Sequence, residues 1–361
     1  MHTITIGVDL AKLSFSTCTV DASGAVSQRR DLRREAFAAW LAQQPAGSIV
    51  AMEACSGAHH WARRCLEHGL VPRLMAAQFV TPFRKSRGAK NDRNDAEAIA
   101  TAARQGNMRF VPVKTIEQQA RLALHRVREG DKTEHLAVGN RLRGLLAEFG
   151  IIVAQSDAAL ARTLADLDAL PLPAAIVPVL AELTTHWHAL RERIRAGDAR
   201  IAAMARSDAR CRRLQAMTGV GPLTADALVA TIGDGRDFKN GRQLAAWLGL
   251  TPAQHSTGGK ARLGSITCRG DGYLRTLLIQ GARSSVQRAR AVSHEMATPE
   301  QRWIQSLDPR MPFGKVLVAI ANKHARQAWA MLAGLLPVSQ TPRLGVMMKP
   351  EVANGKKNVY S

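Results

Sequence analysis

The segment TITIGVD, residues 3–9, marks the start of the predicted N-terminal fold. Ile4, Ile6 and Val8 alternate with polar or small residues, and this period of two is typical of a strand with one buried face. The strand ends near Asp9, which puts a carboxylate at the edge of the sheet that the strand joins. Considered alone, an aspartate in this position most often helps to form a turn.

Strands and helices alternate after this first strand. Further strands are predicted at FSTCTVD (15–21), which a DASG turn (21–24) follows, at GSIVAMEA (47–54) and at LVPRLMA (70–76). Helices are predicted over residues 34–43, 59–69 and 95–106. Because alternating strands and helices build layered sheets, residues 1–110 are predicted to form an α/β domain.

Three more acidic residues stand in positions related to that of Asp9. Glu53 lies near the end of the buried strand, and Asp92 and Asp95 lie in KNDRNDAEAIA (90–100) at a predicted helix start. Strand ends on one edge of an α/β sheet share a crevice, and residues three apart share one face of a helix. A helix packed over these strand ends would bring the four carboxylates together. The alternative is that the two helix acids only complement the helix dipole.

A cluster of four carboxylates repels itself and requires divalent cations. Hard oxygen ligands suit Mg²⁺ or Mn²⁺. Two such ions could activate a nucleophile and stabilise the leaving oxygen in phosphodiester cleavage. The sequence therefore predicts a metal site at Asp9, Glu53, Asp92 and Asp95.

Composition narrows the choice of partner. The chain has 361 residues, enough for two or three domains, and a net charge of +21, so a polyanion is expected to bind it. No apolar run reaches about 18 residues, and the N-terminus shows no signal-peptide pattern, so nucleic acid is preferred to a membrane. The basic loop before the helix acids supplies Arg84, Lys85, Arg87 and Lys90 as phosphate contacts or, alternatively, as solvated charges. Five scattered cysteines without a Cys-x-x-Cys pair indicate a reducing cytoplasm.

Residues 111–211 are predicted to be helical. Apolar residues recur there at steps of three and four, which is a heptad pattern. Its members are Leu180, Leu183, Trp187, Leu190, Ile194, Gly197, Ile201 and Met204. The pattern fits either an intramolecular helical hairpin or an intermolecular coiled coil that joins subunits.

Residues 212–336 are predicted to form a mainly helical C-terminal domain, and residues 337–361 a flexible basic tail. MTGVGPLTA (217–225) predicts a turn between two helices, like a helix-hairpin-helix, in which Gly219 and Gly221 present amides to a DNA phosphate or form only a turn. Residues 254–278 are expected to begin as a loop and to end as a helix.

Several long motifs together resemble one protein family. They are GVDLAK (7–12), MEACSGAHHWA (52–62), KNDRNDAEAIA (90–100), MRFVPVK (108–114), MTGVGPLTA (217–225), LAAWLGLTPAQHSTGGKARLGSIT (244–267) and GDGYLRTLLIQGAR (270–283). The chain resembles, over residues 3–335, the transposases of bacterial insertion-sequence family one-ten, with the eleven-eleven subgroup as the nearer match.

The resemblance implies a resolvase-like (RuvC/RNase H-like) first domain whose Asp-Glu-Asp-Asp tetrad maps onto the four acids above. It also implies a serine nucleophile that forms a covalent phosphoserine link to DNA. Ser256 in QHSTGGK (254–260) carries the less hindered hydroxyl, whereas alignment on Gly258 favours Thr257. Lys260, Arg262, Arg269 and Arg275 then become phosphate contacts, or remain ordinary surface charge; Cys268 stands where the family usually has a basic residue.

The resemblance further implies double-stranded DNA as substrate, guidance by a bridge RNA, homodimers or homotetramers, and a nucleoid-associated protein of the bacterial cytoplasm. Two alternatives stay open. A metal-dependent junction nuclease would use the tetrad with water and would not need the serine. A nonenzymatic DNA-binding protein would use neither, although the four intact carboxylates argue against it.

Overall fold

The computed structural model describes residues 4–84, 92–257, 260–307 and 309–335, without the side chains of residues 255–257, 260 and 261. The chain divides into two compact units, residues 1–130 and 131–361. The division falls inside the long helix α5 (Ile116–Ala147), which belongs to both units.

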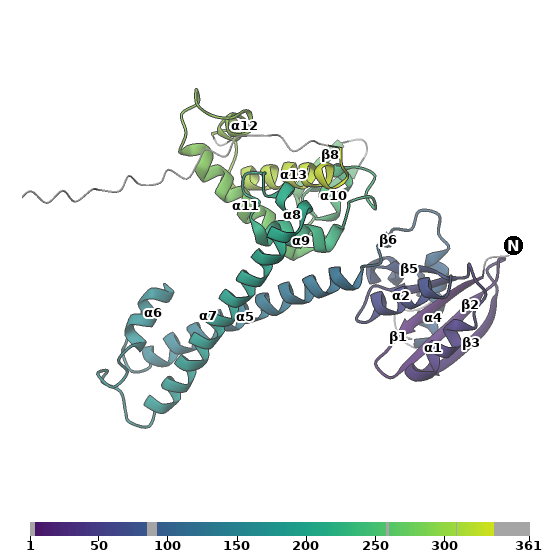
Figure 1. The fold of residues 1–361 in the computed structure, drawn as a ribbon, viewed down its shortest axis with the longest axis horizontal. Helices are drawn as coiled ribbons and strands as arrows, with labels where there is room; N and C mark the ends of the chain where they lie inside the picture. The colour runs from purple at the N-terminus through teal and green to yellow at the C-terminus, as the bar shows by residue number, and fades with distance from the viewer. Residues whose placement is uncertain (1–3, 85–91, 258–259, 308, 336–361) are drawn as a thin grey trace, which may run out of the picture. The chain divides into compact units, whose positions relative to one another are not determined.

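The N-terminal unit is built on a six-stranded mixed sheet of order β3-β2-β1-β4-β5-β6. Its strands are β1 (Thr5–Leu10), β2 (Ser14–Val20), β3 (Val26–Arg33), β4 (Ile49–Glu53), β5 (Val71–Met75) and β6 (Phe110–Val111). Strands β1, β4 and β5 run parallel, whereas β2, β3 and β6 pair antiparallel to their neighbours (Figure 1). The predicted α/β domain is therefore confirmed as a mixed sheet with flanking helices.

Different helices cover the two faces of this sheet. Helices α1 (Arg34–Ala42) and α2 (Ala58–Glu67) pack on the face of Ile6 and Val8, around edge-to-face contacts among Phe15, Phe37 and Trp61. Helix α4 (Asp92–Ala103) packs on the opposite face, with short α3 (Ala77–Val80) and η1 (Thr81–Phe83) beside it. Gly7, Cys18 and Ala51 on this second face are small, which lets α4 lie close to β1.

The middle helices are α5, α6 (Asp157–Leu164) and α7 (Val177–Ser207). The C-terminal part of α5 and the first half of α7 share one buried core with α6, to which Leu142, Leu160, Trp187 and Leu190 contribute. This packing matches the intramolecular hairpin among the two predicted arrangements. The intermolecular coiled coil stays a prediction.

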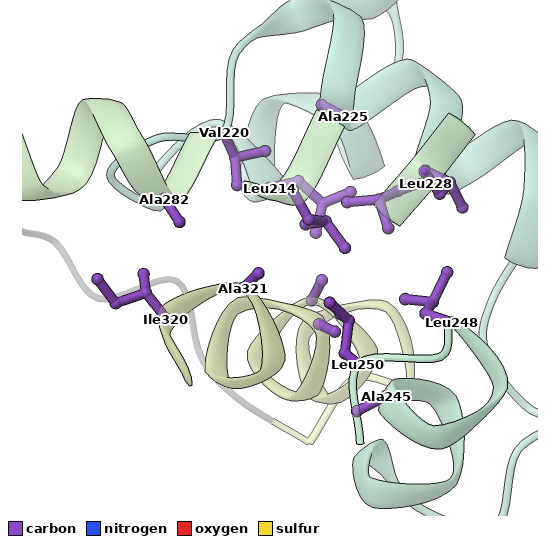
Figure 2. Packing of buried hydrophobic residues seen from close by; sticks show 14 of the residues in the cluster. Leu214, Val220, Ala225, Leu228, Ala245, Leu248, Leu250, Ala282, Ile320 and Ala321 are labelled. Carbon is purple, nitrogen blue, oxygen red and sulfur yellow. The ribbon is translucent and has the colours of Figure 1, made fainter. Parts of the chain in front are cut away.

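The C-terminal part is mainly helical, as predicted. Its helices are α8 (Ala209–Leu214), α9 (Pro222–Ile232), α10 (Gly241–Trp247), α11 (Gly272–Arg290), α12 (Pro299–Leu307) and α13 (Phe313–Leu332). In Figure 2, Leu214 and Leu228 of the α8–α9 segment lie across the core from Ala321 of α13. This core is separate from the core of the middle helices.

One prediction for this part is wrong. Residues 254–257 and 260–266 are strands instead of a loop: β7 (Pro252–Thr257) and β8 (Lys260–Ile266) pair in antiparallel orientation. Gly258 and Gly259 stand between the two strands in the sequence, and two adjacent glycines between strands are a signal for a β-hairpin. The prediction considered only the number of glycines, which favours a loop, and not their position.

The predicted basic tail, residues 337–361, lies outside the described residues. None of the helices that the structure describes between residues 4 and 335 combines the length and the apolar character needed to cross a lipid bilayer.

Candidate functional site

The close approach of α4 to β1 builds the site. Gly7 of β1 has no side chain, and a Cβ there would lie 2.1 Å from the carbonyl oxygen of Ala96 and 2.6 Å from the amide nitrogen of Ala100. Since no other residue type leaves room for this contact, Gly7 fixes where α4 crosses the sheet. The first turn of α4, with Asp92 and Asp95, is thereby held near the end of β1.

Strand periodicity then puts two more carboxylates on the same face. Gly7 and Asp9 are two residues apart in β1, so both face α4. Ala51 pairs with Gly7 and packs against α4, and Glu53 follows it by two residues in β4. Asp9 and Glu53 thus end adjacent parallel strands, one residue beyond the paired Val8 and Met52.

The other three acids act electrostatically on Asp9. Burial, the largest cause, and the negative charges of Asp92, Asp95 and Glu53 raise the pKa of Asp9 from 3.8 to about 6. The positive charge of Arg84 opposes that rise. The structure therefore brings the four predicted residues into one electrostatically coupled cluster.

Arg84 lies inside this cluster. Its Nε is 2.9 Å from Asp95 Oδ1, and its Nη2 is 3.5 Å from Glu53 Oε1. The Asp95 side chain is only 8% exposed and that of Glu53 18%, so the guanidinium neutralises charge that water reaches poorly. Arg84 was predicted to contact phosphate; Lys85, Arg87 and Lys90 of the same prediction lie outside the described residues.

The four carboxylates are suitable ligands for a divalent cation, but the described side chains are not grouped closely enough to coordinate one ion. Four carboxylates are hard oxygen donors, and their mutual repulsion is what a cation relieves. Within the described part of the chain, no three acidic, histidine or cysteine side chains stand close enough together to hold one ion. Arg84 supplies positive charge among these acids.

Arginines of the N-terminal unit fasten α4 to the β2–β3 hairpin. Arg93 Nη2 lies 2.5 Å from Asp31 Oδ2, and Arg29 Nη2 lies 2.6 Å from Glu97 Oε2. Arg104 donates to the carbonyl oxygens of residues 21 and 22. Part of the positive charge in this unit therefore positions the helix that carries Asp92 and Asp95.

The hydroxyl residues lie on the β7–β8 hairpin. Ser256 pairs with Ala261 and Thr257 with Lys260 at the end of β7. The side chains of Ser256, Thr257 and Lys260 lie outside the described residues.

The other predicted phosphate contacts differ in exposure. Arg262 and Arg269 are exposed. Arg275 is half-buried, and its Nη1 donates to the carbonyl oxygens of Leu248 and Arg269, both at 2.9 Å, so this side chain joins α10 to α11.

The two glycines of the α8–α9 turn have different surroundings. Gly219 has φ +84°, and a Cβ there would lie 2.3 Å from the carbonyl oxygen of Gly281 in α11. A Cβ at Gly221 would meet open space. Close packing therefore requires glycine at position 219, whereas position 221 leaves α9 accessible at its start.

Sequence reasoning missed a group of basic residues beside Glu53. His59, Lys114 and Arg126 line a cavity with the loop that follows β4. The signal was present in MEACSGAHHWA and MRFVPVK, whose His59 and Lys114 received no role.

Two family models match this chain. A model described as "Transposase", for the DEDD domain of the IS110 type, matches residues 6–151. A model described as "Transposase IS116/IS110/IS902 family" matches residues 211–297.

Curated bacterial proteins are similar along most of their length. A "Probable family 20 transposase" of Pseudomonas aeruginosa is 46% identical over 92% of this chain and 98% of its own. The "Transposase for insertion sequence element IS1111A" of Coxiella burnetii is 38% identical over 91% of this chain and 89% of its own. The "Transposase for insertion sequence element IS1328" of Yersinia enterocolitica is 37% identical over 90% and 96%, respectively.

Proposed function

Because the chain belongs to the IS116/IS110/IS902 family of transposases, we propose that its carboxylate cluster and its C-terminal serine together cut and rejoin DNA. The chain is a DNA transposase, an enzyme of phosphodiester strand transfer. The finer proposal is that it excises and inserts its own insertion sequence. The proposal depends on one observation: β1, β4 and α4 bring Asp9, Glu53, Asp92 and Asp95 together at one edge of the sheet.

The N-terminal domain is proposed to be resolvase-like. Its support is the sheet order, in which an antiparallel β1–β2–β3 meander continues into parallel β4 and β5, with acids at the ends of β1 and β4. The four carboxylates would hold Mg²⁺ or Mn²⁺. When bound, the ion would lower the energy of negative charge that develops on the reacting oxygens.

Arg84 has a role of its own in this proposal. Its guanidinium stabilises the ionised forms of Asp95 and Glu53 while the acids are unligated. A cation among the acids would repel Arg84, which could then turn to a phosphate oxygen of the substrate, the function predicted for it from the sequence.

Ser256 is the proposed nucleophile, with Thr257 as the alternative at the adjacent position. The serine oxygen would form a bond to phosphorus while the bond from phosphorus to the leaving strand breaks, and the strand that stays attached becomes a phosphoserine ester. The exposed Arg262 and Arg269, together with Lys260, are proposed to hold the DNA backbone near the hairpin.

The remaining partners are proposed from the resemblance of the sequence motifs and not from the geometry. We propose double-stranded DNA as substrate and a bridge RNA as guide, so that base pairing would read sequence while the protein reads backbone. A homodimer or homotetramer in the bacterial cytoplasm, close to the nucleoid, is part of the same proposal. The charge of +21 supports binding to nucleic acid without distinguishing DNA from RNA.

The experiment that tests the mechanism is the trapping of a covalent protein–DNA adduct on denaturing gels. Full-length protein is incubated with element-end DNA, RNA from the flanking noncoding region and Mg²⁺, beside the variants Ser256→Ala, Thr257→Ala and Asp92→Ala. We expect an adduct that Ser256→Ala and Asp92→Ala abolish and that Thr257→Ala retains.

Two other results would redirect the assignment. An adduct lost only in Thr257→Ala and Asp92→Ala would move the nucleophile by one residue. Cleavage without an adduct, unaffected by Ser256→Ala, would leave a metal-dependent junction nuclease. DNA binding without cleavage under any metal condition would leave a DNA-binding protein.

A further inference from the structure

A cavity of about 430 Å³ opens next to the carboxylate cluster, inside the N-terminal unit. Its walls come from the loop after β4, the start of α2, Lys114 in the segment between β6 and α5, and the first turns of α5. The residues that matter for its chemistry are Cys55, Gly57, His59, Lys114, Gln119 and Arg126. No acidic side chain is among the described residues that line it.

Hydrogen-bond donors converge in this cavity. The backbone N–H of Lys114 donates to His59 Nδ1 at 3.2 Å, so the neutral imidazole carries its proton on Nε2. That Nε2 lies 3.5 Å from the ammonium nitrogen of Lys114, which is also a donor. Burial, followed by the charges of Lys114, Arg63 and Arg126, lowers the pKa of His59 to about 4, so the ring stays neutral at physiological pH. The His59 N–H and the positive charges of Lys114 and Arg126 thus line one cavity, and an anionic oxygen is the ligand that suits such a lining.

The positions of these donors are fixed by the fold. Arg63 Nη1 donates to the carbonyl oxygen of Lys114 at 2.7 Å, which holds the backbone of that residue against α2. Gly57, with φ +85°, is the N-cap of α2, and the partial positive charge of a helix N-terminus adds to that of the side chains. Arg126 is exposed on α5 and also lines the cavity.

The cavity directly adjoins the carboxylates. It begins at Ala54, the residue after Glu53. Cys55, the next residue, is exposed in the wall of the cavity. A nucleic-acid strand that runs from the acids to the cavity would therefore leave negative charges that repel its phosphates and reach positive charges that attract them.

We propose that this cavity binds a backbone phosphate of the DNA strand, next to the phosphodiester that faces the carboxylates. The site would fix the register of the strand, so that one phosphate is held by Lys114, His59 and Arg126 while its neighbour lies at the acids. DNA is the assigned source of the phosphate because the adjoining acids belong to the DNA reaction. In this respect the inference rests on the proposed function.

The first test measures DNA affinity against salt concentration, with full-length protein and a chelator present so that no cleavage occurs. Duplex DNA and single-stranded RNA of equal length are compared for wild type, Lys114→Gln and Arg126→Gln. Arg109→Gln is the matched control, because Arg109 is an exposed cation of the same unit that does not line the cavity. For each cavity variant we expect about tenfold weaker DNA binding and a salt slope reduced by about one.

The second test reads the cavity itself. In a Cys268→Ser background, Cys55 is the one remaining exposed cysteine, since the other three are buried. We expect DNA to slow the reaction of Cys55 with a thiol reagent, and Arg126→Gln to remove that protection. Arg126 is exposed on a helix surface, so its variant keeps the fold even if Lys114→Gln, which lies against His59, does not.

Each outcome decides the proposal. Cavity variants that bind DNA like the Arg109→Gln control, with Cys55 equally reactive, would overturn the cavity assignment and leave the proposed transposase mechanism intact. Variants that weaken RNA binding alone would assign the phosphate to RNA and overturn the DNA assignment. A wild-type protein without affinity for DNA would overturn both, whereas failure of the covalent-adduct experiment alone leaves the binding result valid.

Discussion

Burial and three neighbouring carboxylates act on a single side chain, that of Asp9. Its pKa of about 6 is well above the 3.8 of an aspartate in water, so part of the side-chain population is protonated under mildly acidic conditions. Ionised Asp9 is thus disfavoured, even with Arg84 nearby, until a further cation compensates its charge. Binding of a cation beside Asp9 is therefore favoured, because the cation stabilises the ionised carboxylate.

The sign of this shift predicts how pH affects stability. Between pH 3.8 and about 6 the folded state binds more protons at Asp9 than the unfolded state does, so the contribution of Asp9 to stability falls as pH rises and is lowest above about pH 6. Asparagine carries no charge. We therefore expect Asp9→Asn to melt at a higher temperature than wild type at about pH 7.5 without metal, and the difference to shrink toward about pH 4.5.

Differential scanning fluorimetry of both proteins across that range, in a chelator, measures the difference directly. A difference that does not change with pH would mean that the carboxylates do not act on Asp9 as the structure indicates. Addition of Mg²⁺ should stabilise wild type more than Asp9→Asn, because the variant lacks one anionic ligand.

At the scale of elements, the contact of α4 with β1 positions half of the carboxylates. Gly7→Ala puts a methyl group 2.1 Å from a backbone oxygen, so α4 has to move away from the sheet. We expect the N-terminal unit to lose roughly 1–3 kcal/mol or more of unfolding free energy. We also expect covalent-adduct formation to fall, because Asp92 and Asp95 move with the helix.

The matched control for this variant is Gly130→Ala. Gly130 lies in α5, and a Cβ added there would meet no heavy atom within 4 Å, so the change should raise helix stability by about 0.5–1 kcal/mol. Denaturant unfolding followed by circular dichroism separates the two cases. Equal effects of both substitutions would contradict the close packing at Gly7.

The core between α5, α6 and α7 gives a second prediction at this scale. Leu190 is fully buried there, so Leu190→Ala should cost about 2–5 kcal/mol, whereas Val179→Ala, at a side chain 45% exposed, should stay within about 0.5 kcal/mol. Because the core lies within one chain, the loss should be the same at low and at high protein concentration. A loss that grows on dilution would instead support an intermolecular coiled coil.

Sequence patterns identified several elements that bury one face, and they missed strands that bury almost none. The alternation in β1 and the apolar run of β4 are visible because they fill the sheet core. Strand β3 (VSQRRDLR) is almost wholly exposed, so it has no such period, and its Arg29 and Asp31 instead form ion pairs with α4. The hairpin β7–β8 was not predicted for the same reason, because the described residues of β8 are exposed or half-buried.

The site divides in the same way. Asp9, Glu53, Asp92 and Asp95 were predictable because strand ends and helix starts are readable positions. The contacts of Arg84 were not, because the residue follows a 3₁₀ turn whose path depends on tertiary packing. The cavity of His59 and Lys114 joins residues 55 positions apart, a distance that spacing arguments do not bridge.

At the scale of the whole molecule, the two units have separate hydrophobic cores. The N-terminal core contains Leu74 and the C-terminal core contains Leu228, both fully buried. Since units with separate cores need not unfold together, we expect calorimetry of the full chain to show two transitions. Leu74→Ala should lower the temperature of one and Leu228→Ala that of the other. A single transition that both variants shift equally would show that the units unfold as one.

The spacing between Gly7 and Asp9 has a consequence for how this gene can change. A strand turns alternate residues to opposite sides, so inserting one codon between the two would send the acid toward Phe15 and Trp61 and bring an unrelated residue under α4. Deletion of Val8 would do the same. The separation of the glycine from the acid in β1 therefore has to stay at an even number of residues, and single-residue insertions and deletions there should be absent from every functional copy of the element.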